Sequence, residues 1–157
     1  MNSSMPRCTR RGRRRRFPLW RGHAPGGPSP LLAFADRGHR VACYATLSMT
    51  SVDRSACASP LAKGAPKQIR ALLVGRLATD TRVTGLGLGT QTVKHILATA
   101  AELNVKVACR AVVVTALNSA AFSWWQRFGF DPFDAEDPTN LDLYLLTKDI
   151  GATLAGL

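Results

Sequence analysis

One short glycine-rich segment of this chain has the composition of an anion-binding loop. Residues 82–90 contain Arg82 together with Gly85, Gly87 and Gly89. Glycine lets successive backbone N–H groups turn toward one point, and a helix that follows such a loop adds partial positive charge at its N-terminus. The segment therefore suits a pyrophosphate, to which the Arg82 guanidinium can add a charge-assisted hydrogen bond.

Different phosphate-binding loops place their glycines differently, and the spacing here separates them. A P-loop requires Lys and Ser/Thr directly after its last glycine, but Gly89 is followed by threonine and glutamine. A dinucleotide fingerprint requires G-x-G-x-x-G, and both possible registers put threonine where the third glycine should stand. The motif R/Q-x-x-G-x-G/A, typical of acyl-CoA binding, fits Arg82, Gly85 and Gly87. A glycine-rich turn without a ligand remains the alternative.

Apolar segments on either side supply the elements that would position this loop. The run Ala71–Thr79 predicts a central strand before it, and the helical spacing of apolar residues over Leu88–Leu103 predicts a helix after it. The β-branched residues of Val105–Leu117 predict a second buried strand. Ser119–Phe128 predicts a short helix, and the alternation in Leu141–Leu146 predicts a half-exposed strand.

The segments before this unit predict a hairpin and a loop. Leu31–Ala35 and Val41–Met49 are apolar runs separated by polar residues, which is typical of two strands joined by a turn. Residues 50–68 predict a loop with room for a short helical turn. The order of strands, loop and helices indicates an α/β (α+β) domain with at least one parallel strand pair.

The charge of the chain lies mainly at its N-terminus. The 157 residues have a formal net charge of +11, and residues 1–40, with ten arginines and Asp36, carry about +9 of it. Residues 1–30, rich in Arg, Pro and Gly, predict a disordered tail, which leaves 31–157 as the folded domain. No apolar stretch is long enough for a membrane span or an export signal, so we expect a cytoplasmic protein with no membrane partner.

The cysteines argue against a metal site. Cys8, Cys43, Cys57 and Cys109 form no C-x-x-C pair and have no histidine cluster beside them. Cys43 and Cys109 lie in apolar runs, where we expect buried free thiols. This arrangement suits a reducing compartment.

From about Val41 to Leu154 the sequence resembles the GNAT superfamily of N-acetyltransferases, and within it the acetyltransferase toxins of bacterial toxin–antitoxin pairs. The order and spacing of several segments carry this resemblance: the Y-A-T-L-S run (Tyr44–Ser48), the strand Leu72–Asp80, the loop Arg82–Gly89, the F-G-F signature (Phe128–Phe130) and the closing segment Tyr144–Ile150. The resemblance implies a mixed sheet with splayed central strands and flanking helices.

The resemblance also implies acetyl-CoA as co-substrate, without a metal. The positions that would bind it are Leu77, Ala78 and Thr79, through the backbone beside the pantetheine arm, and Arg82, Gly85, Leu86, Gly87, Leu88, Gly89 and Thr90, around the pyrophosphate. Asn118 matches a position near the cofactor arm in many relatives. Its alternative role is the N-cap of the following helix.

The reaction implied by the resemblance is direct attack of an amine on the acetyl thioester, with backbone N–H groups polarising the carbonyl. An acid then protonates the leaving thiolate. In the family a tyrosine three residues before F-G-F does this, and here that catalytic position is Trp125, whose indole N–H cannot replace a phenol. Packing of the short helix is the other interpretation of Trp125. The N-terminal helical segment of the toxin relatives is also missing before Val41.

Three functions remain compatible with these residues. The resemblance implies an N-acetyltransferase whose acceptor is a primary amine, the amino group of aminoacyl-tRNA, so that translation is blocked. Its partners would be aminoacyl-tRNA, a small DNA-binding antitoxin and a second copy of the chain. The change at Trp125 favours a degenerate relative that binds CoA without turnover. The Arg-rich tail favours a nucleic-acid-binding protein, for which several phosphate contacts would give a steep salt dependence.

Overall fold

The chain folds around a mixed sheet, seen in a computed structural model that describes residues 31–35, 41–57 and 59–156. The six strands have the order β1-β2-β3-β4-β6-β5. At the centre, β3 (Gln68–Thr79) and β4 (Ala111–Thr115) are parallel, and the other neighbouring pairs are antiparallel. The predicted α/β class with a mixed sheet and flanking helices is confirmed.

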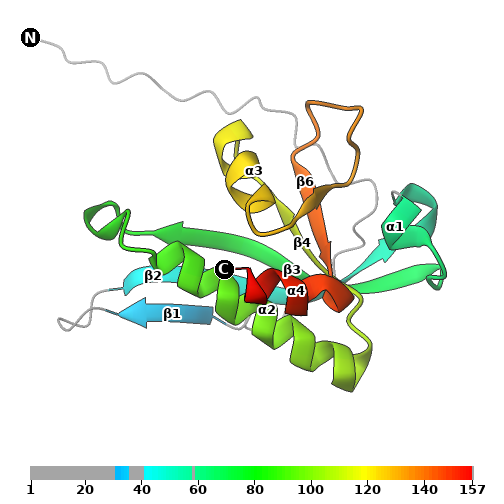
Figure 1. Cartoon of the computed structure of the whole chain (residues 1–157), viewed down its shortest axis with the longest axis horizontal. Coiled ribbons are helices and arrows are strands. Elements are labelled where there is room, and N and C mark those ends of the chain that lie inside the picture. The colour runs from blue at the N-terminus through cyan, green and yellow to red at the C-terminus, as the bar shows by residue number, and fades with distance from the viewer. Residues whose placement is uncertain (1–30, 36–40, 58, 157) are drawn as a thin grey trace, which may run out of the picture.

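The long helix α2 (Leu88–Val107) connects the two parallel strands and runs along one face of the sheet (Figure 1). The other elements, in chain order, are β1 (Leu31–Ala35), β2 (Val41–Asp53), η1 (Arg54–Ala56), α1 (Ser59–Ala62), η2 (Thr81–Val83), α3 (Ser119–Gln126), β5 (Asp131–Pro132), β6 (Asp142–Leu146), η3 (Thr147–Asp149) and α4 (Ile150–Ala155).

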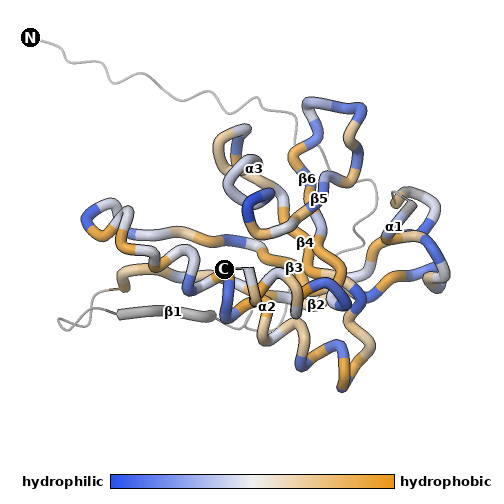
Figure 2. The backbone as a smooth tube through the Cα atoms, viewed as in Figure 1, coloured by the Kyte–Doolittle hydropathy of each residue, from blue (hydrophilic) through white to orange (hydrophobic). Residues whose placement is uncertain are grey.

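Both faces of the central strands are buried. On one face Val112 and Val114 of β4 pack in a cluster with Val93, Ile96 and other apolar residues of α2. On the other face Val113 belongs to a second cluster that includes Leu61 of α1. Figure 2 shows the hydrophobic colouring concentrated on these strands. Burial of each such side chain contributes roughly 1.5–3 kcal/mol, so these two clusters fix the strands that carry the loop.

The predicted hairpin is confirmed, since β1 and β2 pair antiparallel. Its turn, together with the predicted tail at residues 1–30, lies outside the described residues, and the domain boundary stays a prediction. The predicted loop at 50–68 is wrong at its beginning, because β2 extends through Asp53 to pair with Gln68 of β3. The helical turn expected within it is present as η1 and α1.

Two predicted strands differ from the observed ones. The strand predicted at Val105–Leu117 is wrong over its first residues, because α2 continues to Val107 and ends at Ala108 in a left-handed conformation. Val105 is 87% exposed, so no sheet packing acts on its β-branched side chain there. The strand predicted as half-exposed at Leu141–Leu146 is β6, and the half-exposed part of that prediction is wrong. The side chains from Leu143 to Leu146 are all buried, alternately in the first and the second cluster.

The prediction that Cys43 and Cys109 are buried free thiols is confirmed. Within the ranges that the structure describes, no helix has both the length and the apolar character needed to span a bilayer.

Candidate functional site

The two central strands, β3 and β4, stop pairing about halfway along β3. Their parallel pairing covers only Ala71–Val74 of β3 and Ala111–Val114 of β4, while β3 continues to Thr79. A bulge lies at this point, because Val74 pairs with Leu47 and Arg76 with Thr46, which leaves Gly75 as the extra residue. A Cβ at Gly75 would come within 3.0 Å of the Thr46 Oγ1, so only glycine fits without a shift.

The parting of the strands opens a cavity of about 970 Å³. Its wall combines the end of β3, the glycine-rich loop, the residues that follow β4 and one side of α3. Beyond Val74 the edge of β3 that faces β4 has no strand partner among the described residues. That edge therefore presents backbone N–H and C=O groups to whatever occupies the cavity.

Most of the residues predicted from the sequence meet around this cavity. Those that line it are Leu77, Ala78, Thr79, Gly85, Gly87, Leu88, Gly89, Thr90 and Trp125. They come from the end of β3, the loop, the first turn of α2 and α3, which are brought together by the crossover between the parallel strands.

The loop delivers backbone donors to the cavity. Gly85 and Gly87 have φ values of 85° and 78°, a left-handed region that favours glycine. Gly87 is the N-cap of α2 and makes no side-chain capping bond, and the Gln91 N–H donates to its carbonyl at 3.0 Å. The N–H groups of Leu88, Gly89 and Thr90 therefore have no acceptor within the helix. Together with the helix dipole they form a site suited to an anion.

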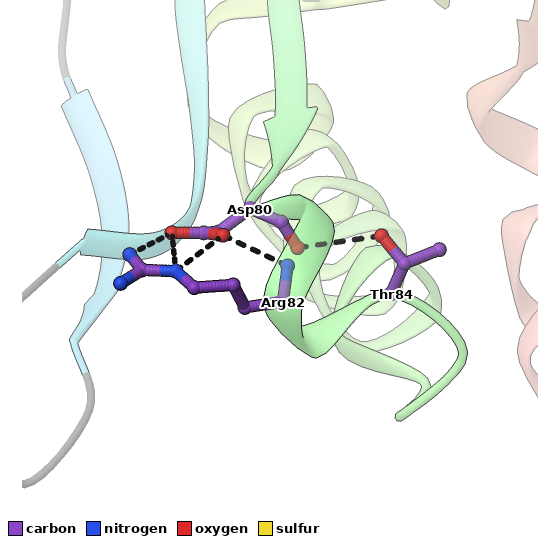
Figure 3. A network of polar contacts seen from close by, with 3 residues as sticks. All are labelled: Asp80, Arg82 and Thr84. Atoms are coloured by element: carbon purple, nitrogen blue, oxygen red, sulfur yellow. Dashed lines mark hydrogen bonds and ion pairs between the residues drawn. The ribbon is translucent and has the colours of Figure 1, made fainter.

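Arg82 is held on the outside of this loop. Its Nε donates to both oxygens of the Asp80 carboxylate, at 3.0 and 3.2 Å, and its Nη2 forms an ion pair with the same group (Figure 3). The Asp80 carboxylate also accepts from the Arg82 backbone N–H, and the Thr84 hydroxyl donates to the Asp80 carbonyl. Arg82 does not line the cavity in this structure. Among the described residues that line the cavity, the cation is Arg76 of β3.

Two other predicted residues also lie off the cavity wall. The side chain of Leu86 is 72% exposed. The Asn118 Oδ1 accepts a hydrogen bond from the Ala121 N–H at 2.9 Å, so Asn118 is the N-cap of α3. This is the alternative that the sequence left open, and the cofactor role of Asn118 stays a prediction.

The two tryptophans have different positions. Trp125 is 5% exposed, and its ring centroid lies 5.1 Å from that of Phe130 in an edge-to-face contact. The packing role is thus observed, and Trp125 is also one of the residues that line the cavity. Trp124 reaches the start of α2, where a Cβ added to Gly89 would be 3.3 Å from its ring. The third glycine of the loop is therefore needed for close packing against α3.

Sequence reasoning missed several residues of the cavity wall. Tyr44, Arg76, Thr115 and Trp124 all line it. Tyr44 lies in a segment that carries the resemblance, and the sequence pattern alone predicts no role for it in the site. A glycine inside the β3 run was a signal for the bulge that precedes Arg76.

The carboxylate with a raised pKa lies next to a residue of the cavity wall. Asp142 of β6 pairs with Thr115 of β4 across the sheet, and the Thr115 hydroxyl hydrogen bonds to its carboxylate. Burial raises the pKa of Asp142 to about 6, and the hydrogen bond from Thr115 opposes that rise.

The sheet has a parallel strand pair that splays apart at the N-terminus of α2, a helix without a side-chain cap. This arrangement defines the GNAT class of acetyltransferase folds, and the chain has this fold. Within that class the chain is homologous to tRNA-acetylating toxins. It is 29% identical over 132 residues to a tRNA-acetylating toxin of Mycobacterium tuberculosis. The aligned residues cover 84% of this chain and 76% of that relative. No family model matches the sequence.

Solved structures of toxins agree with this homology. AtaT complexed with acetyl-methionyl-tRNAfMet has a TM-score of 0.67 and 28% identity, over 78% of this chain and 72% of AtaT. A mutant AtaT toxin bound to the C-terminus of the antitoxin AtaR and acetyl-CoA has a TM-score of 0.59 and 28% identity, over 71% of this chain and 64% of that one.

Proposed function

We propose that this protein is an acetyl-CoA-dependent N-acetyltransferase that acetylates the amino group of aminoacyl-tRNA. The observation that carries the proposal is the cavity between β3 and β4, which ends at the uncapped N-terminus of α2. Support for the acceptor comes from the relatives, one of which acetylates tRNA and another of which is complexed with an acetylated aminoacyl-tRNA. Support for the donor comes from the AtaT structure with acetyl-CoA.

The residues on the cavity wall fit acetyl-CoA. The pyrophosphate would accept hydrogen bonds from the N–H groups of Leu88, Gly89 and Thr90, which the helix leaves without acceptors. The amide groups of the pantetheine arm would pair with the free edge of β3 at Leu77–Thr79, as an added strand does. The bound thioester supplies an activated acetyl group, and the chain's task is to orient it toward the amine.

The chain must also exclude water and hold the acceptor amine against this acetyl group. The apolar part of the wall, with Leu77, Ala121 and Trp124, shields the reacting atoms from solvent. Arg76 gives this wall a positive charge. A positive charge there favours the developing oxyanion and the negatively charged leaving group.

The step most affected by this particular sequence is departure of the thiolate. With Trp125 on the wall, no phenol stands at the family's acid position, and a missing general acid typically costs 10²–10⁴-fold in rate. A thiol has a pKa of about 8.5, so the thiolate is still a workable leaving group near neutral pH. We therefore expect slow but measurable turnover, without the loss of rate at high pH that a tyrosine acid would cause when its proton dissociates.

Trp125→Tyr should restore the missing acid. We expect kcat to increase about 10²-fold, the lower end of a typical general-acid contribution, with little change in KM for acetyl-CoA. Trp125→Phe is the matched control, because it makes the same reduction in ring size without a hydroxyl. Equal kcat values in the two variants would contradict the assignment of this position. Thermal unfolding of both would report the packing lost against Phe130.

The proposed activity is tested by transfer of labelled acetyl from acetyl-CoA to charged tRNA, combined with calorimetry of acetyl-CoA. Gly87→Glu places a carboxylate in the proposed pyrophosphate cradle and should abolish acetyl-CoA binding. Gly64→Glu is the control, since Gly64 has a similar φ of 66° and open space around it but does not line the cavity. Absence of acetyl-CoA binding by the folded parent protein would remove the enzymatic assignment.

The proposed acceptor implies a place and partners for the protein. Aminoacyl-tRNA is a cytoplasmic substrate, so we expect the protein to act there and to block translation. An antitoxin whose C-terminal segment binds the toxin is expected by analogy with AtaT and AtaR. A homodimer remains a prediction. The relatives favour this function over the two alternatives, an inactive CoA-binding relative and a protein that binds nucleic acid through residues 1–30.

A further inference from the structure

A second groove lies at the opposite end of the same strands. Its volume is about 630 Å³, and it is lined where β3 and β4 begin and β6 ends, together with Lys63 after α1. The charged residues on its wall are Lys63, Arg70, Arg110 and Lys148, and no acidic residue lines it within the described ranges. Asp149 follows Lys148 in the chain but is not part of the wall. The groove is therefore strongly positive.

The backbone holds these cations in a fixed row. The Arg110 N–H donates to the Arg70 carbonyl at 2.9 Å, and the Thr147 N–H donates to the Arg110 carbonyl at 2.9 Å. Arg70, Arg110 and Thr147 therefore lie on adjacent positions at one end of the sheet, and Lys148 directly follows Thr147 in the chain. Like charges on neighbouring strands destabilise a sheet. A bound anion would relieve that repulsion.

The side chains of this row are partly anchored to backbone carbonyls, which are neutral partners. Arg70 Nη1 donates to the Val107 carbonyl at 3.3 Å, and Arg110 Nε donates to the Leu61 carbonyl at 3.3 Å. Arg110 Nη2 also donates to the Lys63 carbonyl, which ties Lys63 to the groove. These bonds orient the guanidinium groups without neutralising them. Among the described residues none of the four cations forms an ion pair.

We propose that this groove binds the phosphate backbone of the tRNA whose aminoacyl end enters the cavity. The proposal rests on the proposed function. The side chains of Lys63, Arg70 and Lys148 are exposed, which suits a long phosphate chain lying across the groove better than a small enclosed anion. β3 connects the two sites, and the eight residue-to-residue steps from Arg70 to Ala78 span about 26 Å at about 3.3 Å per step. The groove would thus contact the tRNA away from its reacting end and fix its orientation.

The test measures binding of deacylated tRNA to the full chain as a function of salt, without acetyl-CoA. Each neutralised phosphate contributes about 0.7–0.9 to the slope of log K against log salt. Lys63→Gln and Lys148→Gln should each lower the slope by about that amount. The loss of affinity between about 50 and about 200 mM salt then becomes about threefold smaller for each variant. Both lysines are exposed, so folding should be retained.

The matched control is Arg127→Gln, which removes one positive charge at an exposed position outside the groove. The arginines of residues 1–40 contribute equally to every variant. Slopes for Lys63→Gln and Lys148→Gln equal to that of Arg127→Gln would overturn the proposal. Inorganic pyrophosphate or polyglutamate that binds through these lysines while the tRNA slope stays unchanged would also overturn it, and would assign the groove to a small anion or an acidic peptide. Calorimetry with acetyl-CoA tests the cavity separately, so failure of the groove and failure of the proposed function are distinguishable.

Discussion

The conformation of Gly87 offers a direct test of the proposed anion site in the loop. Gly87 has a φ of 78°, and a Cβ added there would meet no atom within 4 Å. The change Gly87→Ala therefore adds no steric clash and no charge. It perturbs only the left-handed backbone that turns the first amides of α2 toward the cavity.

The expected magnitude follows from the cost of that backbone in a residue with a Cβ. A left-handed conformation costs roughly 1–2 kcal/mol for such a residue. Gly85, Leu86 and Gly87 are exposed, so little packing opposes relaxation of the loop to an ordinary φ. Binding of acetyl-CoA must then restore the left-handed turn, and its affinity should fall by about 5–30-fold.

The assay is calorimetric titration of acetyl-CoA, with the free energy of unfolding measured in parallel. Gly64→Ala is the matched control, because Gly64 also has a positive φ, 66°, and open space for a Cβ. Gly64→Ala should lower the free energy of unfolding by no more than Gly87→Ala does, and it should bind acetyl-CoA as tightly as the parent protein. If Gly87→Ala binds acetyl-CoA as tightly as the parent, preorganisation of this turn does not contribute to binding, and the reasoning about the cradle is wrong.

Two further predictions concern stability. Ala108 ends α2 with a φ of 54°, so Ala108→Gly should raise the free energy of unfolding by about 1 kcal/mol, measured by denaturant titration; no gain would contradict the strain assigned to this cap. The folded-state pKa of Asp142, about 6, lies above the value of about 3.9 expected in the unfolded chain. The folded protein therefore binds this proton more tightly, and stability should fall as pH rises from about 4 to about 6. Asp142→Asn should remove that fall and be more stable than the parent at pH 7, and an unchanged pH profile would show that Asp142 is not responsible.

Much of the fold followed from local sequence patterns. The apolar run in β3, the helical spacing in α2 and the glycines between them were enough to predict a strand, a loop and a helix in that order. These signals are local, since each depends on residues a few positions apart. The ends of elements were less predictable, as at Val105, where helix propagation outweighed β-branched residues that no sheet was near enough to bury.

Contacts and register shifts that the motif does not encode decided the rest of the candidate site. Arg82 stands in the motif and its contact with the pyrophosphate stays a prediction, while in the structure its guanidinium pairs with the Asp80 carboxylate and Arg82 does not line the cavity. Arg76 lines the cavity in the part of β3 that follows the bulge at Gly75 and extends beyond the pairing with β4. Neither outcome can be derived from spacing alone.

The sequence by itself determined which backbone could bind an anion, because only glycines at positions 85 and 87 accept the left-handed turn that exposes the amides of α2. The tertiary structure decided what surrounds this proposed anion site. The short pairing of β3 with β4 opens the cavity, and the common end of β3, β4 and β6 collects four cations from separate segments. Such sites depend on strand register and on burial from both faces, which are properties of the assembled sheet.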